Sequence, residues 1–180
     1  MTHQFIFAGF GGQGMLLLGK FMAMAGMLED KSVSWLPSYG PEMRGGTANC
    51  SVVMSTHKIG SPTVQLADAI IAMNEPSLDK FESMVKPGGI LVINSSIIER
   101  KAVRDDITVV YCDANRIAEE VGNPKGANVA ILGALLEKMP VVSVDSMVEA
   151  IRLELGARKA RFLEGNKKAL VAGMEAARAQ

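Results

Sequence analysis

Short apolar runs alternate with longer segments of helical periodicity along most of this chain. Runs of about four to eight apolar residues bounded by Gly, Pro, Asn or Asp are typical of buried strands, whereas apolar positions recurring every three or four residues indicate helices. The expected strands are 4–8, 32–36, 47–54, 69–73, 90–93 and 107–111. The expected helices are 15–28, one capped by Asn74 with its apolar face at Leu78, Phe81, Met84 and Val85, one capped by Asp113, 128–139, and two after residue 142, the first capped by Ser143 or Asp145.

Because strands and helices alternate almost throughout, the pattern predicts an α/β fold. We expect a three-layer sandwich with a largely parallel, Rossmann-like sheet and helices on both faces. The chain has 180 residues and no linker long enough to divide it, so one domain over residues 1–180 is expected.

Composition adds a question about surfaces. The chain has twelve methionines but only one Trp, two Tyr and six Phe, so its apolar side chains are mostly flexible and aliphatic rather than aromatic. This apolar content either fills an irregular core or covers a partner interface. The segment 157–180 holds six basic and two acidic side chains. It is interpreted as a solvated surface helix or, alternatively, as a docking helix.

Charge and cysteine usage exclude several classes. The 19 basic residues are matched by 19 acidic ones, which argues against a nucleic-acid-binding protein. Glycines interrupt the apolar segment 5–27, so no membrane span is expected. The two cysteines, Cys50 and Cys112, are too few for a four-cysteine iron–sulfur or zinc site. The first residues lack the features of a signal peptide, and a cytoplasmic location is expected.

The first strand is followed by a glycine loop, Gly9-Phe-Gly-Gly-Gln-Gly14, and then by a helix. Glycines allow a tight turn and close approach of the backbone to a phosphate, and the helix start supplies free N–H groups. A NAD site also needs an acid after the second strand, but that strand ends in Leu36-Pro-Ser38. The loop therefore predicts a phosphate-bearing ligand better than nicotinamide, and a tight turn without ligand is the plain alternative.

A second glycine-containing loop follows the second strand, Ser38-Tyr-Gly-Pro-Glu-Met-Arg-Gly-Gly46. Arg44 lies beside Gly45 and Gly46, and a guanidinium clamps phosphate bidentately. Loops that leave the carboxyl ends of strands converge on one crevice in a parallel sheet, so Arg44 is expected to face the first glycine loop. In the alternative reading Arg44 pairs with Glu42 and only makes the loop rigid.

These two loops, together with the segments 71–78, 85–89, 94–96 and Gly122-Asn-Pro-Lys-Gly-Ala-Asn128, resemble the gamma subunit of 2-oxoacid:ferredoxin oxidoreductases. The tyrosine–arginine loop is more similar to the 2-oxoglutarate and ketoisovalerate types than to indolepyruvate enzymes. The resemblance covers most of the chain.

The resemblance implies a division of labour within a hetero-oligomer. Alpha and beta subunits hold thiamine diphosphate, a ferredoxin-like subunit carries iron–sulfur clusters, and ferredoxin accepts the electrons while the 2-oxoacid becomes an acyl-CoA. The gamma subunit is associated with coenzyme A (CoA). The cofactor-binding positions implied on this chain are Gly9, Gly11, Gly12, Gln13, Gly14, Arg44, Gly45, Gly46 and Asn128.

No residue of this chain is expected to be catalytic, and none to bind a metal. Two alternatives stay open: a stand-alone nucleotide-binding oxidoreductase and a non-catalytic interaction module. Nicotinamide titration would test the first, and the second predicts no CoA binding even in a complex. The identity of the oxoacid and the stoichiometry do not follow from this chain, although a homodimer of the isolated chain is a reasonable prior.

Overall fold

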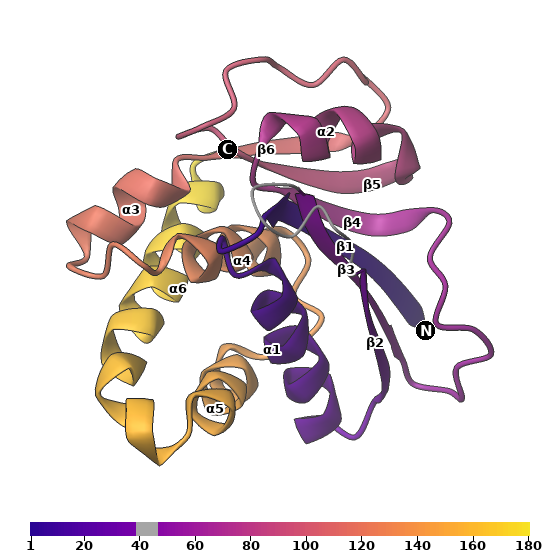
Figure 1. The fold of residues 1–180 in the computed structure, drawn as a ribbon. Helices are drawn as coiled ribbons and strands as arrows, with labels where there is room; N and C mark the ends of the chain where they lie inside the picture. The colour runs from indigo at the N-terminus through magenta and orange to yellow at the C-terminus, as the bar shows by residue number, and fades with distance from the viewer. Residues whose placement is uncertain (39–46) are drawn as a thin grey trace.

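The computed structural model describes residues 1–38 and 47–180. One six-stranded sheet forms its centre, with strands in the order β2-β3-β1-β4-β5-β6 (Figure 1). The strands are β1 (Thr2–Phe10), β2 (Ser32–Ser38), β3 (Thr47–Ser55), β4 (Ala67–Ala72), β5 (Val85–Asn94) and β6 (Thr108–Cys112). The helices are α1 (Met15–Leu28), α2 (Glu75–Phe81), η2 (Glu82–Met84), α3 (Ala114–Glu120), α4 (Ala127–Lys138), α5 (Val144–Leu155), η3 (Ala157–Phe162) and α6 (Leu163–Arg178).

Five of these strands point in the same direction. β1, β4, β5 and β6 pair in parallel. β3 is antiparallel to both β1 and β2, so β2 runs in the same direction as β1. The α/β fold with a largely parallel sheet is therefore confirmed, with one reversed strand inside it. Because β3 pairs Thr47 with Phe10 and Asn49 with Ser38, the ends of β1 and β2 and the start of β3 share one edge of the sheet.

The two faces of the sheet are covered unequally. Phe5, Phe7 and Ile71 point to the face covered by α1, α3, α4, α5 and α6, and Ile6, Ile70 and Leu91 point to the face where α2 packs. Figure 1 shows α2 on the opposite side of the sheet from the other helices. Alternation of side chains along each strand separates these two apolar clusters, as the period of two requires.

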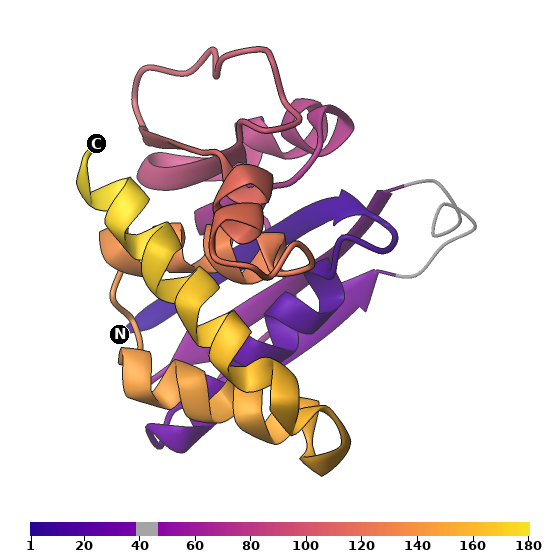
Figure 2. The ribbon, with the colours of Figure 1, turned by 90° about the vertical axis from the view of Figure 1, so that its left-hand side faces the viewer.

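Helices α4 and α6 touch through their backbones. A Cβ built on Gly173 would lie 1.8 Å from the carbonyl oxygen of Ala130, and one on Gly133 would lie 2.0 Å from that of Leu170. Figure 2 shows α6, in yellow, crossing in front of α4 on the helix-covered side of the sheet. The basic tail segment is therefore not simply a solvated helix, because Leu170 and Ala177 are buried against the rest of the chain.

Two local expectations need correction. The helix after Asn74 does not continue to Val85, because α2 ends at Phe81 and Val85 pairs with Ala67 as the first residue of β5. Lys86 directly precedes Pro87 and is therefore biased towards an extended conformation. The short 3-10 helix η2 ends the helical segment, and Val85 is already extended. Residues 86–89 form an irregularity inside β5, where the register shifts against β4 and Gly88 has a φ of 78°.

The helix cap expected from Asp113 is supplied by other residues. The Asn94 side-chain oxygen accepts from the Ala114 N–H at 3.3 Å, and the Ser96 hydroxyl accepts from the Asn115 N–H at 3.0 Å. Asp113 instead accepts from the Ser96 hydroxyl and pairs with Arg116. The expected caps at Asn74 and Ser143 are confirmed, each accepting the N–H three residues later.

Within the described part of the chain, no helix is both long and apolar enough to cross a membrane.

Candidate functional site

A cleft of about 410 Å³ opens at the carboxyl end of β1, where the glycine loop meets the starts of α1 and α4. One wall comes from the first residues after β1, and another from the loop that precedes α4. The third wall comes from the end of α5, η3 and the start of α6. A volume in this range suits a small organic ligand.

The glycine loop turns through backbone conformations that favour glycine. Gly12 has a φ of 92° and Gly14 a φ of 78°, both left-handed. Gly14 is the N-cap of α1, and no side chain caps this helix start. The first turn of α1 also carries no acidic residue. The first N–H groups of α1 thus have no intrahelical partner, and the positive end of the helix dipole lies at the cleft.

Gln13 holds the loop in shape from inside. Its side-chain oxygen accepts from the Phe10 N–H at 2.6 Å, and its amide nitrogen donates to the Met73 carbonyl at 3.5 Å. Gly9 leaves room for this arrangement, since a Cβ there would lie 2.6 Å from the Gln13 oxygen. The Gln13 amide therefore braces the loop against β4, and the residue borders the cleft while its side chain is engaged within the protein.

Asn128 connects the two helix starts. It is 8% exposed and is the second residue of α4, so it is not the cap, which is Gly126. Its amide nitrogen donates to the Gly14 carbonyl at 3.3 Å, while its oxygen accepts from the Val129 N–H at 3.0 Å. A Cβ on Gly14 would lie 2.5 Å from the Asn128 amide nitrogen. The pair Gly14–Asn128 therefore fixes α1 against α4.

The charge of the cleft is positive. Lys125 and Lys159 border it, and none of the residues that line it is Asp or Glu. Neither lysine forms a salt bridge with any residue in 1–38 or 47–180. The N-cap residue of α4, Gly126, likewise offers no side chain to cap the helix, and the first turn of α4 carries no acidic residue, although the Val129 N–H bonds to Asn128. Two helix starts and two lysines around a cleft without carboxylates form a site suited to an anion.

The structure brings together four of the residues singled out from the sequence: Gly12, Gln13, Gly14 and Asn128 all line the cleft. Gly9 and Gly11 do not line it and instead shape the strand-to-helix turn. Arg44, Gly45 and Gly46 lie outside the described residues, as does Glu42. The flanking residues Ser38 and Thr47 lie at the same sheet edge as the glycine loop.

Sequence reasoning missed the third wall of the cleft. Lys159 and Phe162 line it from η3, and Asn166 lines it from α6. The basic excess of the tail was a signal, but only the packing of α6 on α4 carries that segment to the glycine loop. Asn166 donates to the Phe162 carbonyl at 2.9 Å, which helps fix the turn from η3 into α6.

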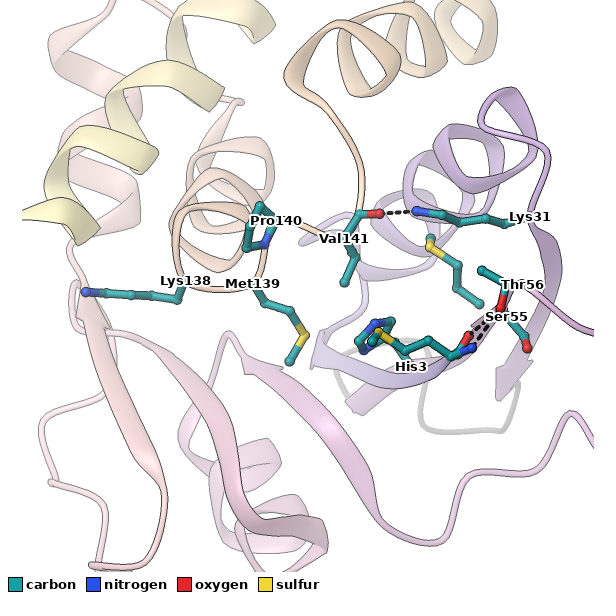
Figure 3. Close-up of a pocket in the computed structure, with 10 residues that line it drawn as sticks. His3, Lys31, Ser55, Thr56, Lys138, Met139, Pro140 and Val141 are labelled. Carbon is teal, nitrogen blue, oxygen red and sulfur yellow. Dashed lines mark hydrogen bonds between the residues drawn. The ribbon is translucent and has the colours of Figure 1, made fainter.

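A second cavity, of about 390 Å³, lies at the opposite end of β1 (Figure 3). His3, Lys31 and Met139 line it, but its cations are engaged or turned away. Lys31 pairs with Glu29 at 3.1 Å and donates to the Val141 carbonyl, and Figure 3 shows Lys138 extending away from His3. Burial is the largest influence on His3 and lowers the pKa of its imidazole. This cavity is therefore less suited to binding an anion than the glycine-loop cleft is.

Both cysteines are buried within strands, Cys50 in β3 and Cys112 in β6. Burial raises the pKa of the Cys50 and Cys112 thiols to about 12, so neither thiol ionises near neutral pH. Among residues 1–38 and 47–180, no group of three or more His, Cys, Asp or Glu side chains is arranged to hold a metal ion. The described residues therefore do not fit an iron–sulfur cluster.

The sequence matches known proteins along nearly its whole length. A family model described as pyruvate ferredoxin/flavodoxin oxidoreductase matches residues 4–176. Ketoisovalerate oxidoreductase subunit VorA of Methanothermobacter marburgensis is 38% identical over 173 residues, covering 95% of this chain and 36% of that protein. 2-Oxoglutarate synthase subunit KorC of Methanocaldococcus jannaschii is 34% identical over 154 residues, covering 84% of this chain and 82% of that protein. The chain thus spans about a third of one curated relative and most of the other.

Solved structures share the fold. The gamma subunit of a keto/oxoacid ferredoxin oxidoreductase from Geobacter sulfurreducens superposes with a TM-score of 0.84, at 30% identity and 99% coverage of both chains. The 2-oxoglutarate:ferredoxin oxidoreductase of Magnetococcus marinus, solved with 2-oxoglutarate, coenzyme A and succinyl-CoA bound, gives a TM-score of 0.89 at 23% identity. It covers 99% of this chain and 31% of that one.

Proposed function

Because this chain belongs to the pyruvate ferredoxin/flavodoxin oxidoreductase family, as its motifs indicated, we propose that it is the gamma subunit of a cytoplasmic 2-oxoacid:ferredoxin oxidoreductase. Its task in that complex is to bind the phosphates of CoA and to contact the other subunits. The relatives named for ketoisovalerate and 2-oxoglutarate make these two classes of oxoacid the candidates for the complex.

One observation carries the CoA assignment. The starts of α1 and α4 meet at a cleft that holds two lysines without salt-bridge partners among the described residues and no carboxylate. The diphosphate of CoA is the group that such a site attracts, since helix N–H groups and ammonium groups both stabilise phosphate oxygens. A protein that shares the fold is known with coenzyme A bound.

The residues divide this work between shape and charge. Gly12 and Gly14 let the backbone approach the diphosphate, Gly11 belongs to the turn that leads into them, and Gly9 with Gln13 keeps the loop folded. Asn128 keeps the α4 start against the loop. Lys125 supplies charge from the loop before α4, and Arg44, next to Gly45 and Gly46, supplies more from the second loop.

The remaining chemistry belongs to partners. Alpha and beta subunits would hold thiamine diphosphate, which supports decarboxylation of the oxoacid, and a ferredoxin-like subunit would hold the clusters that reduce ferredoxin. The two thiols of this chain, both buried with raised pKa values, do not fit cluster ligation.

The NAD-type alternative is disfavoured by the order of strands. In a dinucleotide fold the second strand lies beside the first and ends in an acid that holds the ribose. Here β3 separates β2 from β1, and β2 ends at Ser38 without a carboxylate. A titration of the chain with NADH would show saturable binding only if that alternative were correct.

A CoA titration of the assembled complex tests the proposal. Lys125→Glu places a negative charge at the cleft and should raise the KM for CoA about ten- to a hundredfold. Cluster reduction by oxoacid without CoA, followed by stopped flow, should stay nearly unchanged, because that half-reaction occurs on other subunits. Lys167→Glu, an exposed α6 position that does not line the cleft, is the matched control.

Arg44→Ala is expected to behave as Lys125→Glu does, with a ten- to hundredfold weaker apparent affinity for CoA, roughly the loss of one charge-assisted contact. Arg44→Lys should retain only part of the affinity for CoA, since lysine keeps the positive charge but lacks the planar guanidinium that bonds phosphate in two places. If CoA-free reduction collapses while the CoA KM is unchanged in these variants, this chain supports the thiamine site or an interface instead.

A further inference from the structure

The third wall of the cleft carries an aromatic ring and a cation from the same short helix, η3. Phe162 is 44% exposed although it lines the cleft, and Lys159 stands three residues before it in η3. The Arg161 guanidinium lies 4.7 Å from the centre of the Phe162 ring and adds positive charge beside it. The Phe162 ring is therefore available in the cleft to stack on a flat aromatic group of a ligand.

Lys159 has no carboxylate to balance it. No salt bridge to Lys159 forms within 1–38 and 47–180, and the cleft holds no Asp or Glu among its lining residues. The helix starts of α1 and α4 already provide for one anionic group at the glycine loop. A further cation at η3 therefore favours a ligand with a second, separate anionic group.

We propose that η3 recognises the adenosine 3′-phosphate end of CoA, with Phe162 stacking on the adenine and Lys159 pairing with the 3′-phosphate. This inference rests on the proposed CoA function and adds selectivity to it. A phosphomonoester carries a charge of about −1.5 to −2 near neutral pH, and base–aromatic stacking is available to any nucleobase. The cleft then distinguishes CoA from nucleotides that lack a 3′-phosphate.

Two contacts connect the third wall of the cleft to its neighbours. Asn166 ties α6 to the Phe162 carbonyl at 2.9 Å, and a Cβ on Gly165 would lie 3.4 Å from the Asn123 Cβ in the loop before α4. The start of α6 is thus in contact with the second wall, and η3 is held between α5 and α6. A ligand that spans the glycine loop and η3 would meet two preformed ends.

The test compares CoA with 3′-dephospho-CoA on the complex captured through a tag on this chain, by competition against a fluorescent CoA analogue. The unchanged protein should prefer CoA by about tenfold or more. Lys159→Ala should remove that preference, weakening CoA about tenfold and dephospho-CoA less than about twofold. Phe162→Ala should weaken both ligands together, because stacking does not depend on the phosphate.

Arg158→Ala is the matched control, since Arg158 is an exposed cation of the same segment that does not line the cleft, and it should leave the preference intact. If CoA binds and Lys125→Glu weakens it, but Lys159→Ala weakens both ligands equally or neither, the η3 assignment is wrong and the CoA function stands. If neither ligand binds the complex, both proposals fall.

Discussion

At the scale of single residues, a comparison of two glycines separates the cost of backbone strain from the cost of a steric clash. Gly14 and Gly122 have the same φ of 78°, but a Cβ meets the Asn128 amide at 2.5 Å in the first case and nothing within 4 Å in the second. A non-glycine residue in this conformation costs roughly 1–2 kcal/mol by itself. Any larger effect at Gly14 therefore comes from displacement of Asn128.

We expect Gly14→Ala to lower the free energy of unfolding by about 1–2 kcal/mol more than Gly122→Ala does. Urea denaturation of the two variants measures this difference. The affinity of the complex for CoA should fall for Gly14→Ala and not for Gly122→Ala. In Gly14→Ala the loss of CoA affinity should exceed the loss in the yield of assembled complex. Equal loss of CoA affinity and assembly in Gly14→Ala would mean that the loop serves the fold rather than a ligand.

The same scale shows what sequence could and could not predict in the site. The spacing from Gly9 to Gly14 predicted a tight strand-to-helix turn, because only glycine adopts those φ values easily. It did not reveal that Gln13 turns inward, since that depends on the distant Met73 carbonyl. The place of Lys159 at the cleft was also hidden, because a lysine in a polar segment gives no sign of which surface will face it.

At the scale of elements, Glu29 joins the end of α1 to the start of α5. Its carboxylate accepts from the Ser143 N–H at 2.7 Å and pairs with Lys31 at 3.1 Å. Burial raises the pKa of this carboxyl, but the hydrogen bonds from Ser143, Ser146 and Lys31 outweigh it and lower the pKa to about 2. The negative charge also faces the positive start of α5, where it is favourable.

Glu29→Gln should therefore destabilise the fold by about 1–2 kcal/mol at neutral pH. Since the folded pKa lies below the unfolded value of 4.5, this contribution is complete above about pH 4.5 and is lost as pH falls towards 2. Thermal unfolding at pH 7 and at successively lower pH should show the variant and the parent converging in acid. A gap that widens in acid would contradict the assignment.

The crossing of α4 and α6 depends on residues without side chains. Gly173→Ala would drive a methyl group into the Ala130 carbonyl, and the helices must separate to admit it. We expect a loss of about 1–3 kcal/mol or more, measured by urea denaturation. Gly60→Ala, where a Cβ meets nothing within 4 Å and φ is not left-handed, should be nearly neutral. Near-equal stabilities of the two variants would show that the helices slide apart easily.

Element order was the part of the fold that the sequence predicted best. Helix 15–28 has the bounds expected from its apolar pattern, and the strand centres coincide with the apolar runs. The reversal of β3 could not be predicted, because antiparallel and parallel strands with one apolar face show the same alternation. The cap of α3 was misassigned because Asn94 and Ser96 reach it from another strand end.

At the scale of the whole molecule, the two apolar clusters share the strands of one sheet, which supports the proposal that residues 1–180 form one domain. Those clusters are mostly aliphatic with a few phenylalanines, and Met15, Met22, Met54 and Met73 are almost fully buried in them. Part of the high methionine content therefore fills the core. Other apolar side chains are exposed, among them Phe10 and Leu36 at the sheet edge, and these provide apolar surface that a partner could cover.

The purified chain alone should reduce no acceptor dye with any 2-oxoacid, thiamine diphosphate and CoA present. The reason is that its described residues offer no cluster ligands and its thiols stay protonated. Adding the partner subunits should restore CoA-dependent turnover. Dye reduction by the chain alone would overturn the assignment as a gamma subunit.

The cleft takes its walls from opposite ends of the chain, residues 12–21 and residues 123–166, and this has a consequence for biosynthesis. The six strands in the described part of the chain all precede residue 113, so the sheet can pair while the chain is still being made. The segment that carries Lys159 and Phe162 is translated last and docks on a sheet that already exists. A chain that ended before Gly156 would thus have its glycine loop in place but only two of the three walls of the cleft.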